Sequence, residues 1–158
     1  MPKFSVLAVL LGAACTMPDP PAPTQGTFDW TSFRSAEVGF ELEVPDDYRA
    51  DVESGGHAVL FRAERGVPVK VYWTTEAASG DRGLWFDEDP VGPAMLAGRE
   101  GQLYEYLHCD GLFCSRMKSY VIPFRDRLLA LEFRSNGDLH EVNRHILESF
   151  RIRDTIRG

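Results

Sequence analysis

Two cysteines lie five positions apart in the stretch LHCDGLFCSR, residues 107 to 116, and such a pair can bind a metal, react as thiols or form a disulfide. A zinc site needs four ligands, and no second pair of Cys or His is placed to complete a tetrahedron around Cys109 and Cys114. A catalytic thiol needs a neighbouring base and reducing surroundings. The choice therefore depends on the compartment of the protein, with a metal site and free thiols as the alternatives to a disulfide.

The histidines of HEVNRH are the second candidate for chemistry, because zinc proteases carry two histidines on one helix face. That motif spaces its histidines four apart, whereas His140 and His145 are five apart and diverge by about 140° around a helix of 3.6 residues per turn. The chain also lacks a Gly-x-Ser-x-Gly elbow, a CxxC pair and a phosphate-binding loop. We therefore assign no catalytic residue, no metal ligand and no cofactor.

A candidate contact surface lies within residues 80 to 97, where Trp85 and Phe86 are followed by Asp87, Glu88 and Asp89. Aromatic side chains with a polar rim are typical of protein interfaces. The alternative is that both rings cap the core beneath a loop. The acidic run lacks the spaced ligands and central glycine of a calcium loop, so it does not predict a metal site.

The first 27 residues are not expected to belong to the folded domain. The run SVLAVLLGAA has signal-peptide length and is too short for a bilayer, which needs ~20 residues. Small residues then precede Cys15, and this arrangement resembles the signal of a bacterial lipoprotein, which is cleaved before a cysteine that receives lipid. Cleavage after Ala14 without lipidation, or a short hydrophobic N-terminal helix, are the alternatives. We expect a signal peptide at residues 1–14 and a lipid-bearing Cys15.

Residues 15–27 are rich in proline and polar residues, which is typical of an extended tether. The lipoprotein resemblance implies attachment to the membrane through the N-terminal lipid. It also implies an outer-membrane location in the cell envelope, because Thr16 follows the cysteine where retention at the inner membrane would favour Asp. A secreted or soluble periplasmic protein is the alternative.

Residues 28–158 suit a single domain with a core of its own. Without Lys3 the chain carries 16 basic and 24 acidic residues, a net charge of −8, which argues against nucleic-acid binding. The charge is uneven: residues 16–110 hold 7 basic and 18 acidic residues, and residues 111–158 hold 9 and 6. Two solvated faces would explain this difference, and so would a dipolar surface that orients a partner.

Alternating apolar and polar residues predict a domain built mainly of strands. In VGFELEVPDDY, Val38 to Val44 alternate with glutamates, and Pro45 ends the strand. Further strands are predicted at 57–63, 67–75, 102–109, 114–122 and 127–135, with 31–35 pairing across AEVG. Short connections favour antiparallel neighbours. Residues 76–96 hold too many Gly and Pro for a long helix and are expected to form a long excursion.

The strands at 102–109 and 114–122 place Cys109 opposite Cys114 across a four-residue hairpin loop, with Glu105 facing Lys118 as a favourable cross-strand pair. In an exported domain, where oxidising conditions preserve disulfides, we therefore predict that Cys109 and Cys114 are bonded to each other.

One helix is predicted near the C-terminus. Asp138 followed by Glu141 forms a capping box, and apolar residues then recur on a single stripe that ends at Phe150. The next residues, FRIRD, can add a short edge strand.

The strand GFELEVPDDY, the run of antiparallel strands and the helix closing on HILESFRI resemble the PsbP-like family, over roughly residues 31 to 152. The resemblance implies an α+β fold with a single antiparallel sheet of about six to seven strands and a C-terminal helix packed on one face. Members of this family mostly bind or scaffold, and they share no catalytic set that could be transferred here. We therefore expect a non-catalytic binding or structural role in the cell envelope, with an envelope protein as the candidate partner, and a small exported hydrolase as the alternative.

Overall fold

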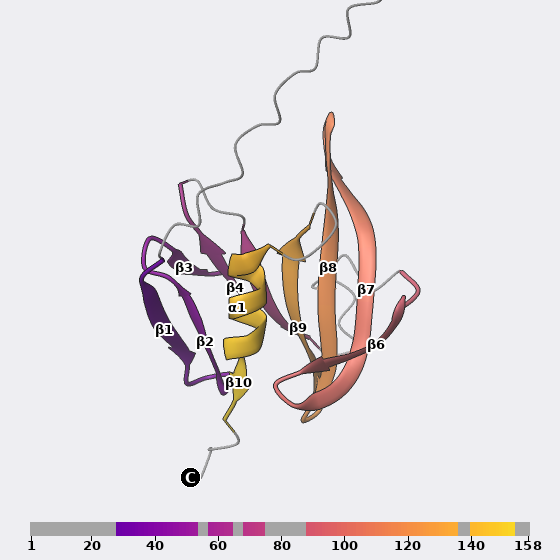
Figure 1. Cartoon of the computed structure of the whole chain (residues 1–158). Coiled ribbons are helices and arrows are strands. Elements are labelled where there is room, and N and C mark those ends of the chain that lie inside the picture. The colour runs from indigo at the N-terminus through magenta and orange to yellow at the C-terminus, as the bar shows by residue number, and fades with distance from the viewer. Residues whose placement is uncertain (1–27, 54–56, 65–67, 75–87, 136–139, 154–158) are drawn as a thin grey trace, which may run out of the picture.

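The computed structural model describes residues 28–53, 57–64, 68–74, 88–135 and 140–153. Two antiparallel sheets and one short helix make up these residues (Figure 1). The smaller sheet has the order β1-β2-β10, and the larger has the order β3-β4-β5-β9-β8-β7-β6. The strand and helix bounds are β1 Trp30–Ser35, β2 Phe40–Pro45, β3 Arg49–Val52, β4 Ala58–Arg62, β5 Val69–Thr74, β6 Gly92–Leu96, β7 Arg99–Asp110, β8 Phe113–Phe124, β9 Arg127–Arg134, α1 Glu141–Ser149 and β10 Arg151–Ile152.

The expectation of a single sheet was wrong, because β2 joins a separate sheet. Its two edges are bonded to β1 and to β10, so neither edge is available to the larger sheet. The pairing of β1 with β2 across residues 36–39 and the short edge strand after the helix were both predicted correctly. Alternation reveals that one face of a strand is buried, but it does not reveal whether a strand beside it or a second sheet covers that face.

The main core lies between the two sheets and includes α1. From β2, Phe40 is buried against Trp73 of β5, and its ring stacks on that of Phe150 with centroids 5.5 Å apart. Phe33 of β1 meets Phe61 of β4 edge to face at 5.0 Å. Side chains from both sheets and from the helix thus pack together in one core.

The helix begins at Glu141 rather than near the predicted cap at Asp138, which lies outside the described residues. His140 occupies the N-cap position and makes no capping hydrogen bond through its side chain. The buried side chain of Asn143 donates to the backbone oxygen of Arg134 at the end of β9. This contact ties the first turn of the helix to the large sheet, and the sequence motif gives no sign of it.

Two strands of the large sheet were not predicted. All four residues of β3 are exposed, so their sequence shows no alternation. β6 falls within the segment 76–96 that was expected to be irregular and contains Gly92 and Pro93. Proline is tolerated there because β6 is an edge strand, paired only with β7.

Candidate functional site: a disulfide-bonded hairpin tip

The β7–β8 hairpin extends beyond the rest of the large sheet. Its two strands are 12 residues each, whereas β9 covers β8 only as far as Met117 and β6 covers β7 only as far as Leu103. The outer part, residues 107–115, is therefore a two-stranded ribbon that projects from the domain (Figure 1). An isolated two-stranded hairpin is marginally stable in water, so such a ribbon needs an additional constraint.

The predicted disulfide between Cys109 and Cys114 supplies this constraint. The two residues are direct partners in the hairpin register, with Cα atoms 4.0 Å apart. The connection has two residues rather than the predicted four, because the strands continue to Asp110 and from Phe113. Gly111 takes the first loop position with φ +61°, the conformation that type II′ hairpin turns require of that residue.

The predicted ion pair between Glu105 and Lys118 is also present, farther from the turn than the disulfide. The Lys118 ammonium lies 3.1 Å from the Glu105 carboxylate, and the two residues are direct partners in the register. Both side chains are half-buried, and as directly opposite, oppositely charged residues they favour this register of the hairpin.

Three large apolar side chains are exposed on the ribbon, and we call them the hairpin tip: Leu107, Leu112 and Phe113. Leu112 is 97% exposed, Phe113 82% and Leu107 67%. Leu107 shares a face with the disulfide, Phe113 lies on the opposite face, and Leu112 lies in the turn between them. Apolar surface is therefore presented on both faces and at the apex of one projection.

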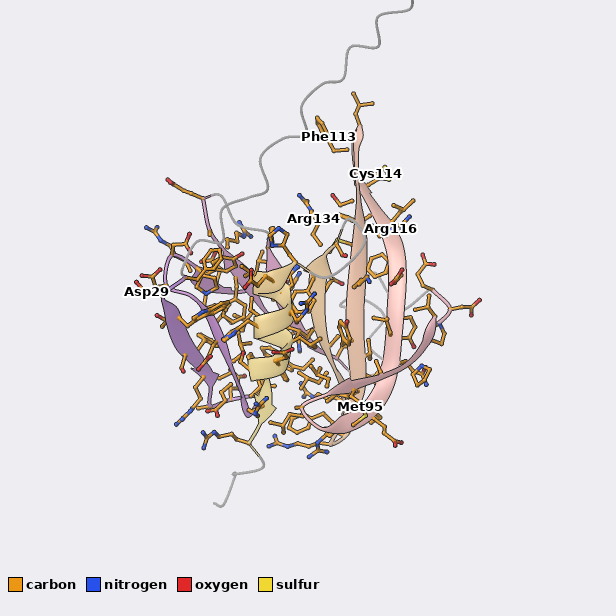
Figure 2. All side chains as sticks on the ribbon, in the orientation of Figure 1. Asp29, Met95, Phe113, Cys114, Arg116 and Arg134 are labelled. Atoms are coloured by element: carbon orange, nitrogen blue, oxygen red, sulfur yellow. A yellow bond between two sulfur atoms is a disulfide. The ribbon has the colours of Figure 1, made fainter. Side chains whose placement is uncertain are left out.

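Two arginines lie at the base of the ribbon. Arg116 is the strand partner of Leu107, and Arg134 lies beside Met117 at the end of β9. Both side chains are exposed, and in the described part of the chain neither forms an ion pair. Figure 2 shows the two arginines below Phe113 and Cys114. The tip is thus an apolar projection with positive charge behind it.

The contact surface predicted from the sequence lies in a different place. Trp85, Phe86 and Asp87 are outside the described residues, and Glu88 and Asp89 are exposed just before β6. That prediction stays untested. Sequence reasoning did not identify the hairpin tip, although the exposed position of a turn residue such as Leu112 follows from the Asp-Gly signal before it.

A buried carboxylate lies on the face of the large sheet that is turned away from the main core. Glu132 of β9 is only 4% exposed, and its Oε2 accepts hydrogen bonds from the hydroxyls of Tyr106 and of Ser119, the latter at 2.9 Å. Its Oε1 accepts a hydrogen bond from the Tyr72 hydroxyl at 3.3 Å. Burial, followed by the nearby Glu132 charge, raises the pKa of Tyr72 and of Tyr106 well above the usual range. Both tyrosines therefore remain hydrogen-bond donors, and the cluster is a satisfied polar network on this face of the sheet.

A second polar group lines a cleft of about 370 Å³ between β2 and α1. The Nε2 atom of His145 lies 2.7 Å from Glu43, and the imidazole stacks on Trp30 with ring centroids 3.6 Å apart. Ser149 lies in the same cleft, where its hydroxyl accepts from the backbone N–H of Glu43 and donates to the Ile146 carbonyl. Sequence reasoning rejected His145 as a metal ligand and did not identify its pairing with Glu43.

The described residues contain no group of three His, Cys, Asp or Glu side chains arranged to hold a metal. Among the same residues, no helix has the length and apolar character needed to cross a bilayer.

Comparisons with known proteins define the fold. No family model matches the chain, and no curated protein matches it. A crystal structure from Bacteroides thetaiotaomicron VPI-5482 is similar with a TM-score of 0.57 and 11% identity, over 77% of this chain and 48% of that one. The chain thus spans about half the length of the Bacteroides protein.

The solution structure of the cyanobacterial PsbP protein (CyanoP) from Synechocystis sp. PCC 6803 is similar with a TM-score of 0.54 and 14% identity, over 86% of this chain and 99% of that one. LpqN of Mycobacterium tuberculosis, described as involved in cell envelope biogenesis, is 18% identical over 81% of this chain and 92% of that one. Its TM-score of 0.42 is too low to support an argument. The resemblance to PsbP-like proteins expected from the sequence is therefore supported at the level of the fold, an antiparallel α+β arrangement.

Proposed function

We propose that this chain is an exported lipoprotein of the bacterial cell envelope, anchored through Cys15, whose domain binds another envelope component without catalysing a reaction. The outer membrane is the proposed location, as the residue after Cys15 implies for proteins with this type of signal. The observation that carries the binding role is the hairpin tip, because three large apolar side chains are exposed on one constrained projection. Exposed apolar clusters mark interaction sites on soluble domains.

The disulfide supports export. Disulfides persist in oxidising compartments such as the periplasm and are rare in the cytosol. The sulfur atoms of Cys109 and Cys114 are bonded to each other, so this pair does not support the alternative of free reactive thiols.

A small hydrolase, the alternative function, would need a nucleophilic side chain that is hydrogen-bonded to a general base. Ser149 and His145 share the cleft between β2 and α1, but the imidazole Nε2 faces Glu43 and the serine proton is donated to the Ile146 carbonyl. The geometry therefore gives the hydrolase no activated nucleophile in this cleft.

Anchoring is tested by labelling cells with a fatty-acid analogue. We expect label on the wild-type chain and none on the Cys15→Ser variant, because the proposed acceptor is the Cys15 thiol. The matched control is the Cys109→Ser/Cys114→Ser variant, which lacks the other two cysteines of the chain and should retain the label. Equal labelling of wild type and Cys15→Ser would contradict the lipoprotein proposal.

The binding role is tested by placing a photo-crosslinking amino acid at Leu112 in living cells. Val52 is the control position, because it is a large apolar residue that is 63% exposed and belongs to the edge strand β3. We expect irradiation to produce adducts from position 112 and not from position 52. Adducts of equal yield from both positions would show that the tip has no preferred contact.

A further inference from the structure

We infer that the hairpin tip inserts into the headgroup region of an anionic lipid bilayer. This inference deepens the proposed function and rests on it for the membrane location, because it names the lipid surface as the component that the domain contacts. The tip residues and the arginines behind them carry the argument.

The distribution of apolar side chains favours a surrounding partner over a flat one. Leu107 and Phe113 lie on opposite faces of the ribbon, and Leu112 lies at its apex. A flat protein surface could cover only one of these faces, whereas a bilayer interface encloses all three once the ribbon enters it. Interfacial segments enter the boundary between headgroups and acyl chains by ~5–10 Å, and the ribbon from Leu107 to the turn is about 15 Å long at ~3.4 Å per residue.

The charges behind the tip match an anionic lipid surface. Arg116 and Arg134 are exposed and, among the residues that the structure describes, have no acidic partner in an ion pair. Between residues 107 and 116 the sequence has one acidic residue, Asp110. Each basic residue held near an anionic membrane strengthens binding roughly fivefold.

The disulfide prepares the ribbon for insertion. It joins the strands in the middle of the part that has no third strand, so the tip keeps its shape without support from β6 or β9. A constrained ribbon loses less conformational freedom on binding than a flexible loop does.

The proposed tether does not select this face by itself. The 13 residues 15–27 could reach about 40 Å at the ~3.1 Å per residue of an extended Pro-rich segment, which would let many faces of a small domain approach the bilayer. The apolar tip distinguishes one of those faces.

The test is vesicle flotation of the mature chain from residue 15 with Cys15→Ser, so that no acyl chain contributes. Vesicles contain phosphatidylethanolamine with phosphatidylglycerol, or phosphatidylcholine alone. We expect binding to the anionic vesicles that falls at least about tenfold in Leu112→Ser/Phe113→Ser, since both apolar side chains are lost. Arg116→Gln/Arg134→Gln should weaken binding to anionic vesicles and reduce its salt dependence.

The matched control is Val52→Ser/Val91→Ser, which removes two other exposed apolar side chains and should bind like the parent chain. No flotation of the parent chain, or equal flotation of the parent and the tip variant, would overturn the inference. Sedimentation would show whether the parent chain dimerises. A parent chain that dimerises without binding vesicles, and a tip variant that stays monomeric, would assign the tip to a second copy of the chain. That result would also overturn the inference. Fatty-acid labelling at Cys15 is independent of these results, so failure of the inference and failure of the lipoprotein proposal are distinguishable.

Discussion

Replacing Tyr106 with phenylalanine should destabilise the domain by about 2 kcal/mol, because a hydrogen bond to a charged group contributes ~1.5–3 kcal/mol. The Tyr106 hydroxyl donates to Oε2 of Glu132, which is buried, and the phenyl ring would keep its packing against Val121 and Ala130. Ser119 would remain as the second donor to the same oxygen, which limits the loss. Tyr72→Phe should cost less, about 1 kcal/mol or below, because its hydrogen bond is 3.3 Å long and its side chain is only partly buried.

The same variant should change the alkaline stability of the domain. Burial raises the pKa of Tyr106 in the folded state, and the neighbouring Glu132 charge adds to the increase. Above the unfolded pKa of ~10 the unfolded chain loses this proton while the folded chain retains it, so stability falls as pH rises. Linkage gives a loss of at most about 1.4 kcal/mol by pH 11 for one such tyrosine. This contribution should disappear in Tyr106→Phe.

The assay is urea unfolding followed by tryptophan fluorescence, at neutral pH and at steps above pH 9. The matched control is Tyr120→Phe, which removes a hydroxyl that has no hydrogen-bond partner in the described part of the chain, from the opposite face of β8. The control should change stability by less than about 0.5 kcal/mol at neutral pH. Equal stability of Tyr106→Phe and Tyr120→Phe at neutral pH would refute the view that the Tyr106 hydroxyl stabilises the buried carboxylate.

Two further changes test the large sheet. Cys109→Ser/Cys114→Ser should lower stability by up to about 2 kcal/mol, the chain-entropy value for so short a closed loop, and should speed amide hydrogen exchange in residues 107–115 more than in the core. Unchanged exchange in the ribbon would show that the bond does not constrain it. Gly101→Ala should cost more than about 2 kcal/mol, since a Cβ there would lie 2.1 Å from the backbone oxygen of Val121 and must displace it. A melting temperature within one degree of wild type would contradict this.

The features predicted correctly from the sequence are those set by local pattern. Period-two alternation and a short hairpin loop were enough to place Cys109 opposite Cys114 and Glu105 opposite Lys118. The pairing of β1 with β2 followed from the same kind of reasoning over 16 residues, from Trp30 to Pro45. Short hairpins can be predicted in this way because the turn determines their register.

The features that were missed depend on distant parts of the chain. Glu132 sits at a polar position of the alternating run RLLALEFRS, which indicates a wet face, yet hydroxyls from β5, β7 and β8 cover it. Exposure of Leu107 likewise depends on where β9 ends, and no local signal marks that point relative to the hairpin. The division into two sheets was missed for the same reason. Only the pairing of β2 with both β1 and β10 shows that β2 does not join the larger sheet, and β10 lies far along the chain.

The position of β10 determines when this domain can fold during synthesis. Phe40 near the start of the domain is covered by Phe150, and the smaller sheet is completed only by Arg151 and Ile152. The central pairing of β5 with β9 also joins Val69 to Phe133, far along the chain. Contacts this distant in sequence form slowly, and a chain emerging N-terminus first cannot make them until Arg151 and Ile152 are available. The core between the two sheets therefore closes only after synthesis has passed Ile152, and until then Phe40 is not covered by Phe150.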